Sequence, residues 1–101
     1  MSQENAILII NAIANKENMA EVQSYLSNIM PVFAKNGGKP IARYKTVENL
    51  SGEQSPEMVA IVEFPSADII REMIQGDDFK SLSESRSKAF TKLNLIISSP
   101  M

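Results

Sequence analysis

The sequence predicts a single α+β domain in which an antiparallel sheet carries helices on one face. Two runs, 6–13 and 58–64, alternate in the manner of strands and are mostly apolar on both of their faces. Each run is followed by a segment whose apolar residues recur at helical spacing. A strand that is apolar on both faces needs one layer of protein above it and another below it. The helices provide one of these layers, so the second has to come from elsewhere.

Length and composition bound the class of protein. With 101 residues the chain forms one domain, 1–101, and its hydrophobic content of 44% is typical of a globular protein. The net charge is −2, the pI is about 5.1, and the basic residues are scattered along the chain. The sequence therefore shows no cluster of basic residues of the kind that binds nucleic acid or anionic lipid. We therefore expect neither a nucleic-acid partner nor a membrane partner.

Two absent residue types narrow the chemistry. The chain has no cysteine, which excludes disulfides, iron–sulfur clusters and thiol catalysis and suits a reducing cytosol. It also has no histidine, which removes the commonest metal ligand, general base and haem ligand. No apolar run approaches the ~20 residues of a membrane span, and the N-terminus lacks the pattern of a signal peptide. These observations predict a cytoplasmic protein without a metal or another cofactor.

The segment after the first strand predicts a helix over 18–36. Asn15 or Asn18 can cap this helix, and Glu21 stands in capping-box register with Asn18. Tyr25 lies about 80° from the centre of the apolar stripe, at its edge, where a phenol can reach a cavity or water. The stripe itself consists of Met19, Val22, Leu26, Ile29, Met30 and Phe33.

Two features shape the end of this helix. Pro31 leaves the Ser27 carbonyl without its helical partner, so we expect a kink or a break, with 32–36 as a separate turn or a kinked continuation. Gly37 and Gly38 then end the helix, because glycine adopts the left-handed conformation without steric cost. A phosphate-binding loop would place its glycines before a helix, so this pair marks a helix end.

A weaker and more polar strand over 39–47 follows the glycine pair. Pro40 near its start predicts an edge position, because an interior strand would miss that N–H group. The segment 48–57 contains many polar residues and predicts a solvated hairpin loop. Regular alternation puts Ile41, Arg43, Lys45 and Val47 on one face of the strand and Ala42, Tyr44 and Thr46 on the other.

The central strand, 58–64, leads into the second half of the chain. Pro65 ends the strand pairing, and Ser66 is well placed to cap the helix that follows. Gly76 breaks that helix, and Asp78 is the expected cap of the next one. The remaining elements are expected at 67–75 (helix), 79–89 (helix) and 93–98 (strand).

The element order β-α-β-β-α-(α)-β closes most simply as a ferredoxin-like βαββαβ antiparallel sheet with helices on one face. The second and fourth strands are then the edges, which agrees with Pro40. The face of the sheet without helices would leave about five apolar side chains in water. Burying each of them would stabilise the protein by roughly 1.5–3 kcal/mol, so we expect this face to be an interaction surface. We therefore expect a homodimer in which two sheets face each other. The apolar sets are Ile7, Ile9, Val59 and Ile61 on one face and Leu8, Ile10, Val62 and Phe64 on the other.

Several short motifs resemble one known family. The run 63–66 (Glu-Phe-Pro-Ser), the turn 76–82 and then Arg86 are similar to the strand–helix signature of the dimeric α/β-barrel superfamily. The Gly-Gly turn within 34–39 and Arg43 resemble its uncharacterised branch, the domain-of-unknown-function family 1330. The first helix of that branch often carries an aromatic residue where Tyr25 stands. The resemblance spans nearly the whole chain and implies a dimeric α/β barrel, but it imports no activity, because fold and function are separable.

Three side chains are candidates for a ligand site between the sheet and the helices: Tyr25, Arg43 and Arg86. An arginine fork suits a carboxylate or an enolate, and a phenol can donate to an oxyanion. The resemblance to the family also implies a ligand site at these three positions. The alternative is structural: Arg43 would pair with Glu63 on the neighbouring strand, and Arg86 would pair with an acid on a helix.

Other polar residues allow two interpretations each. Glu63 is the one acid inside an apolar strand, and it could serve as a catalytic base or be a paired carboxylate at the rim. Asn11 is either a polar strand end or a pocket-lining amide. Asp77, Asp78 and Glu84 could hold a hard cation, but helix capping accounts for Asp78 more simply, so no metal is expected.

Two functions remain open from the sequence. In the first, the dimer binds a small anionic or carbonyl-bearing molecule and performs no chemistry. In the second, it is a cofactor-independent enzyme of the isomerase or monooxygenase type, which acts on a small carbonyl or phenolic compound. Glu63 or Tyr25 would then move a proton. A cavity on which Tyr25, Arg43 and Arg86 converge would support a ligand site, and Glu63 within reach of it would favour catalysis.

Overall fold

The computed structural model describes residues 5–52 and 56–100. Its strands are β1 (Ala6–Ala14), β2 (Lys39–Lys45), β3 (Met58–Phe64) and β4 (Phe90–Ser98). A short 3-10 helix, Lys16–Asn18, precedes α1 (Met19–Lys35), and the later helices are α2 (Ala67–Gln75), α3 (Asp77–Lys80) and α4 (Ser83–Ala89).

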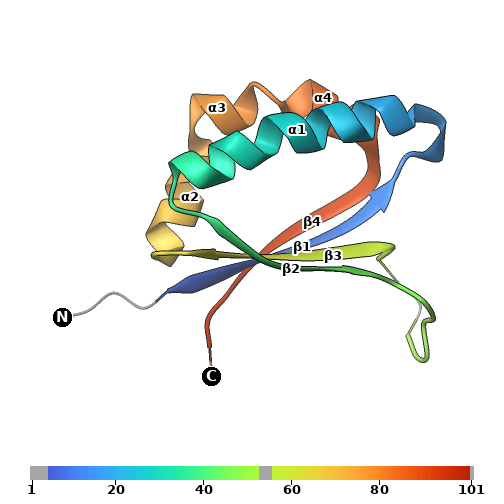
Figure 1. Ribbon diagram of the computed structural model, residues 1–101, viewed down its shortest axis with the longest axis horizontal. Coiled ribbons are helices and arrows are strands. Elements are labelled where there is room, and N and C mark those ends of the chain that lie inside the picture. Colours follow the sequence, from blue (N-terminus) through green and yellow to red (C-terminus); the bar gives the residue numbers. More distant parts are fainter. Residues whose placement is uncertain (1–4, 53–55, 101) are drawn as a thin grey trace.

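The strands of this described part form one antiparallel sheet in the order β2-β3-β1-β4, and the helices lie on one of its faces (Figure 1). β2 and β4 are the edges, as the position of Pro40 predicted. The predicted α+β architecture, with a ferredoxin-like strand order, is therefore confirmed.

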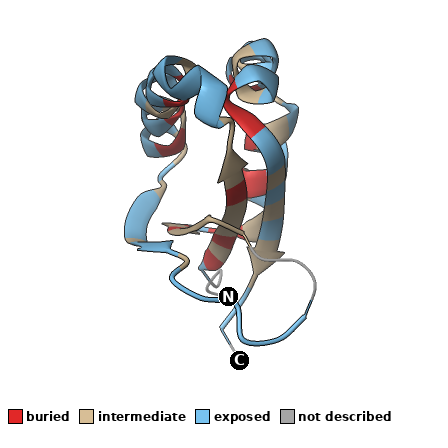
Figure 2. Cartoon of the chain, turned by 90° about the vertical axis from the view of Figure 1, so that its right-hand side faces the viewer, coloured by how far each residue is buried: buried red, intermediate tan, exposed pale blue. Residues whose placement is uncertain are grey.

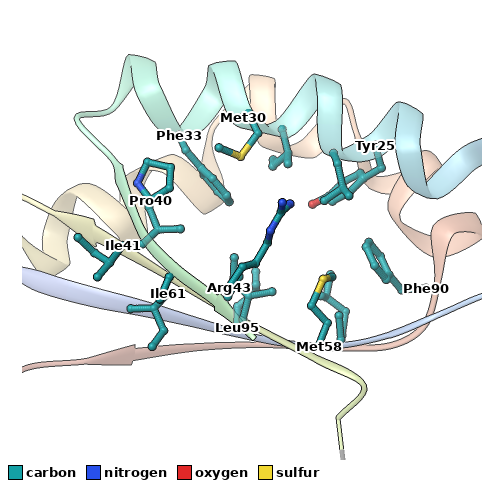
Figure 3. Close-up of a pocket in the computed structure, with 18 of the residues that line it drawn as sticks. Tyr25, Met30, Phe33, Pro40, Ile41, Arg43, Met58, Ile61, Phe90 and Leu95 are labelled. Carbon is teal, nitrogen blue, oxygen red and sulfur yellow. The ribbon is translucent and has the colours of Figure 1, made fainter. Parts of the chain in front are cut away.

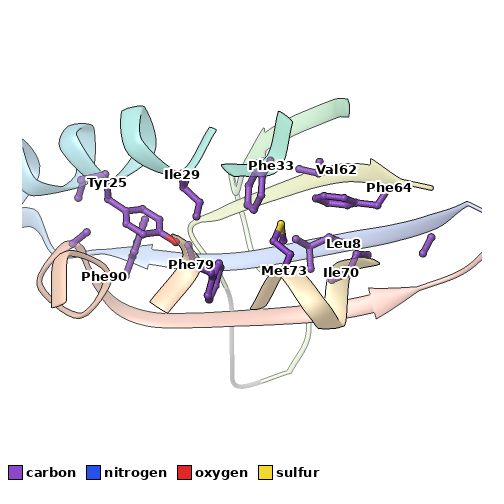
Figure 4. Packing of buried hydrophobic residues seen from close by; sticks show 14 residues of the cluster. Leu8, Tyr25, Ile29, Phe33, Val62, Phe64, Ile70, Met73, Phe79 and Phe90 are labelled. Carbon is purple, nitrogen blue, oxygen red and sulfur yellow. The ribbon is translucent and has the colours of Figure 1, made fainter. Parts of the chain in front are cut away.

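The hydrophobic core lies between the sheet and the helices, where Figure 2 shows the buried residues. Strand pairing aligns Leu8 of β1 with Val62 of β3 and Ile97 of β4; Leu8 and Val62 belong to the core, and the partly buried Ile97 packs against it. Phe33 of α1 meets Phe64 of β3 edge to face, with ring centroids 5.9 Å apart (Figure 4). This contact fixes the C-terminal end of α1 over the sheet.

In the described residues, the opposite face of the sheet carries no helix (Figure 1). Ile9 of β1 lies at its centre, paired with Ile61 of β3 and Ile96 of β4. None of the three is buried within the chain, and Ile96 is 43% exposed. Neighbouring positions on this open face are also apolar and include Ile7, Ile13, Tyr44 and Val59.

α1 continues through Pro31 to Lys35, so of the two predicted alternatives the break with a separate turn at 32–36 is wrong. Pro31 and Ser27 are both exposed, and water can therefore reach the Ser27 carbonyl that the proline leaves without a partner. Beyond the proline, the buried contact of Phe33 holds the last turn in place. No helix among residues 5–52 and 56–100 has the length and apolar character needed to cross a membrane.

The buried side of α1 is rotated relative to the predicted stripe. Tyr25 is 6% exposed and packs edge to face on Phe90, with ring centroids 5.5 Å apart. Met19 and Met30 are instead 47% and 41% exposed. α4 packs beside α1 and covers the side of α1 that carries Tyr25. The periodicity of α1 alone had put this side at the edge of the apolar stripe. Tyr25 is therefore a core residue.

Two predicted cap residues make cap bonds. The Ser66 hydroxyl oxygen accepts a hydrogen bond from the backbone N–H of Ile69 at 3.2 Å, at the start of α2. The Asn15 side chain accepts from the backbone N–H of Glu17 at 3.1 Å, at the start of the 3-10 helix. Asn18, the alternative cap, makes no side-chain cap bond to α1.

The predicted helix 79–89 is divided into α3 and α4, and Asp78 caps neither. The Asp78 carboxylate instead accepts a hydrogen bond from Lys35 Nζ at 2.8 Å, which links α3 to the end of α1. This bond raises the pKa of Lys35, because the carboxylate stabilises the charged ammonium group. The last strand begins at Phe90, three residues earlier than the sequence predicted.

A β-bulge in β2 changes which of its residues face the helices. The pairing of β2 with β3 shifts between Pro40 and Ala42. Pro40 consequently lies opposite Val62 and Arg43 lies opposite Ala60, both on the helix side of the sheet. The regular alternation expected from the sequence would have separated Pro40 and Arg43 onto different faces. The bulge therefore turns both residues toward α1.

We expect Gly38→Ala to destabilise the fold by about 1–3 kcal/mol through overpacking. A Cβ atom at Gly38 would lie 2.8 Å from the Phe64 ring and 2.9 Å from the Phe33 carbonyl oxygen. Urea denaturation measures the loss. Gly52→Ala is the control, because its φ of +88° costs only about 1 kcal/mol and its new Cβ meets nothing within 4 Å. Equal losses in the two variants would contradict the packing argument.

Candidate functional site

A cavity of about 360 Å³ lies between α1 and the sheet (Figure 3). Two of its lining residues, Met30 on α1 and Ile41 on β2, are 41% and 57% exposed, so the cavity opens between this helix and the edge strand. Among the described residues, Tyr25 and Arg43 are the side chains with polar groups that line it. The walls are aliphatic and aromatic and include Leu26, Phe33, Met58, Phe90 and Leu95.

Arg43 reaches the cavity from the edge strand. Its position opposite the small Ala60, on the helix side of the bulged strand, lets the side chain extend toward α1, as Figure 3 shows. Among the described residues, no acidic side chain lies within ion-pairing distance of Arg43. Arg43 is exposed, and its guanidinium group brings a positive charge without a described ionic partner to the edge of an otherwise apolar cavity.

Tyr25 supplies the second polar group. Its hydroxyl points into the cavity, on the side where the Arg43 side chain ends (Figure 3). The Tyr25 oxygen accepts a hydrogen bond from Arg86 Nε at 3.0 Å. Because that bond uses the oxygen as an acceptor, the phenolic proton remains available for a different partner.

Arg86 does not line the cavity. Its Nη2 donates to the Phe79 carbonyl oxygen at 2.9 Å, and its guanidinium carbon lies 3.9 Å from the centre of the Phe79 ring. It makes no ion pair with an acid of the described helices, so the predicted structural alternative for Arg86 is not found there. The structure thus brings Tyr25 and Arg43 to the cavity and puts Arg86 behind Tyr25 as its support.

Glu63 lies on the open face of the sheet. It pairs with Ile7 of β1 and Lys39 of β2, whereas Arg43 pairs with Ala60 on the helix side. The sheet therefore separates Glu63 from both the cavity and Arg43. This placement fits neither the predicted catalytic base beside the other candidates nor the predicted Arg43–Glu63 pair.

The remaining polar candidates also lie away from the cavity. Asn11 faces Asn94 across the open side of the sheet. Asp78 is paired with Lys35, and Glu84 is paired with Lys88 at 3.2 Å. Within residues 5–52 and 56–100, no three carboxylates are close enough together to hold a metal ion.

Two aromatic residues contribute to the site in a way that sequence reasoning missed. Phe79 in α3 and Phe90 at the start of β4 both line the cavity. Phe90 packs on the Tyr25 ring, and Phe79 stacks on Arg86. Helical periodicity gives no signal for the Phe79–Arg86 contact, because the chain between these residues is divided into α3 and α4.

The family model described as "Domain of unknown function (DUF1330)" matches residues 6–99. The chain belongs to this family. The match confirms the resemblance drawn from the Gly-Gly turn and from Arg43. Among curated proteins, no match was found.

Solved structures show the same fold. A protein of unknown function from Rhodopseudomonas palustris has a TM-score of 0.80 at 22% identity, and the match covers 98% of this chain and 84% of that one. A dimeric protein of unknown function with a ferredoxin-like fold from Bacteroides fragilis has a TM-score of 0.67 at 11% identity, covering 99% and 100%. A protein provisionally named an antibiotic biosynthesis monooxygenase, from Nitrosomonas europaea, has a TM-score of 0.69 at 7% identity, covering 100% and 94%.

We expect Arg86→Met to destabilise the fold by about 1–3 kcal/mol, because it removes the donor to the Tyr25 oxygen and the contacts of the guanidinium group with Phe79, whose carbonyl keeps the Leu82 N–H as a donor. Urea denaturation provides the measurement. Arg71→Met is the matched control: Arg71 pairs on the surface with Asp68, and its loss should cost less than about 0.5 kcal/mol. If the two variants are equally stable, Arg86 does not support Tyr25.

Proposed function

We propose that this protein binds a small anionic or carbonyl-bearing molecule in the cavity between α1 and the sheet. One observation carries the proposal: an apolar cavity is lined by a tyrosine hydroxyl with a free proton and by an arginine without an acidic partner among the described residues. Cavities of about 300–1,000 Å³ with apolar walls and a few polar groups are typical of small-molecule sites. Arg43 would contact the ligand directly, and Tyr25 would donate to its oxygen.

We further propose that the protein acts as a homodimer through the open face of the sheet. The face formed around Ile9, Ile61 and Ile96 is apolar, and the described part of the chain does not cover it. Removing such side chains from water provides about 1.5–3 kcal/mol each. The fold relative from Bacteroides fragilis is itself described as dimeric, which supports a dimer without identifying the face that forms it.

A second candidate function is a cofactor-independent enzyme of the isomerase or monooxygenase type. The observation that favours it is the Tyr25 hydroxyl, which is held by a cation and can donate a proton to a carbonyl oxygen. Its weakness is the missing base: among the described residues no carboxylate lines the cavity, and Glu63 lies across the sheet. Binding without chemistry is therefore the function that the geometry supports best.

Arg43→Met tests the ligand site. We expect this substitution to remove the stabilisation that small carboxylates and ketones give in a thermal-shift screen, while the melting temperature of the unliganded protein stays within about 2 °C. The unliganded protein is unaffected because Arg43 makes no ion pair among the described residues.

Lys45→Met is the matched control for this experiment. Lys45 lies on the same strand and on the same face as Arg43, opposite Met58, but it does not line the cavity. It should therefore retain every ligand response of the unmodified protein. If Arg43→Met lowers the melting temperature of the unliganded protein and leaves ligand responses intact, Arg43 is a structural residue.

Ile9→Glu tests the dimer. We expect it to shift the protein from dimer to monomer in sedimentation equilibrium and to lower its stability, because it puts a charge at the centre of the apolar face. Met19→Glu is the control, since Met19 is 47% exposed at the start of α1 and lies away from that face. A folded monomer at micromolar concentration in the unmodified protein would contradict the proposed assembly.

A further inference from the structure

The polar groups that line the cavity are all suited to a negatively charged partner. Arg43 brings a full positive charge, and among the described residues no acid lies near enough to neutralise it. Tyr25 brings a hydroxyl whose oxygen already accepts a hydrogen bond from the cationic Arg86. The walls thus offer hydrogen-bond donors and positive charge, but no described carboxylate.

Arg86 determines the direction in which the Tyr25 proton points. Its Nε donates to the phenolic oxygen at 3.0 Å, so the proton cannot point toward Arg86 and is left to the cavity side. Two contacts with Phe79 hold the guanidinium group in this position, a hydrogen bond of 2.9 Å to its carbonyl oxygen and stacking at 3.9 Å on its ring. Tyr25 itself is 6% exposed and is held against Phe90, so its ring has little freedom to turn away.

The volume of the cavity points to a ligand with a large apolar part. At about 360 Å³ it is much larger than a carboxylate group. Apart from Arg43 and the Tyr25 hydroxyl, the described lining is aliphatic and aromatic. Filling these walls with apolar atoms removes hydrophobic surface from water on both sides of the contact.

We propose that the cavity selects an apolar monoanion, whose carboxylate or similar anionic oxygen group is bound by Arg43 and the Tyr25 hydroxyl, and that Arg86 is the positioning residue that aims the tyrosine proton at it. This inference rests on the proposed function and narrows it, because a neutral carbonyl compound of the same shape is then a poor ligand. An anionic ligand should bind more tightly than a neutral one, because hydrogen bonds to a charged acceptor are roughly twice as strong as those between neutral groups.

The test compares matched probes by isothermal titration calorimetry near neutral pH. Naphthoate and octanoate supply an anionic group on an aromatic and an alkyl body, the corresponding amides are neutral molecules of the same shape, and acetate is the anionic group alone. We expect at least one of the two carboxylates to bind about tenfold more tightly than its amide. Acetate should show no measurable binding.

Arg43→Met should lower the affinity for the carboxylate to that for the amide, and Lys45→Met should leave both affinities unchanged. Equal binding of carboxylate and amide to the unmodified protein would overturn the preference for an anion and leave the proposed small-molecule function intact. If acetate binds as tightly as the larger carboxylates, the inference that the ligand has a large apolar part is wrong. If no probe binds, the proposed function fails together with this inference.

A double-mutant comparison tests the positioning role of Arg86. Arg86→Lys and Arg86→Met should each weaken carboxylate binding at least about threefold when Tyr25 is present, and neither should have this effect in a Tyr25→Phe protein. A residue that only stabilises the fold would weaken binding equally in both backgrounds, and that result would overturn the role. The lysine variant keeps a donor near Phe79, so the test holds if the methionine variant is too unstable to measure.

Discussion

Strands β1 and β3 carry apolar side chains on both faces of the sheet, and the rest of the structure depends on this constraint. On one face, Leu8 and Val62 pack under the helices and form the floor of the core. On the other face, Ile9 and Ile61 lie side by side without cover from the described chain. The described helices cover only the first of these faces, and the proposed dimer contact would cover the second. The same central strands therefore form the floor of the cavity on one face and present an apolar surface for the proposed dimer contact on the other.

The polar lining of the cavity depends on a departure of the edge strand from regular geometry. The bulge at the start of β2 turns both Pro40 and Arg43 toward α1, whereas a regular strand would have turned one of them to the open face. Just before this strand, Gly38 passes so close to the Phe64 ring that a side chain would not fit. An edge strand tolerates such a bulge better than a central strand, because its outer side has no ladder of hydrogen bonds to break. A local irregularity at the sheet margin thus determines which charge faces the cavity.

The contact between Tyr25 and Arg86 joins two segments that are 61 residues apart in the sequence. It requires the division of the C-terminal helical region into α3 and α4, because Arg86 in α4 reaches back to the Phe79 carbonyl in α3 while it donates to Tyr25 in α1. In this arrangement one guanidinium group donates to two oxygens at once. Positioning the phenol and joining the helices are therefore effects of the same side chain.

The sequence by itself determined the element order, the edge position of β2, the end of α1 at the glycine pair and the apolar second face, because these follow from local pattern and backbone chemistry. It also named Tyr25 and Arg43, which line the cavity. It could not determine that α1 passes through Pro31, that Tyr25 is buried, or that Glu63 and Arg86 lie outside the cavity. Those outcomes depend on contacts between segments distant in sequence, such as Phe33 against Phe64 for the end of α1, the pairing of β3 for Glu63, and the packing of α4 beside α1 for Tyr25 and Arg86. Periodicity describes how one element is oriented along its own axis, and only tertiary packing decides which side of that element another one covers.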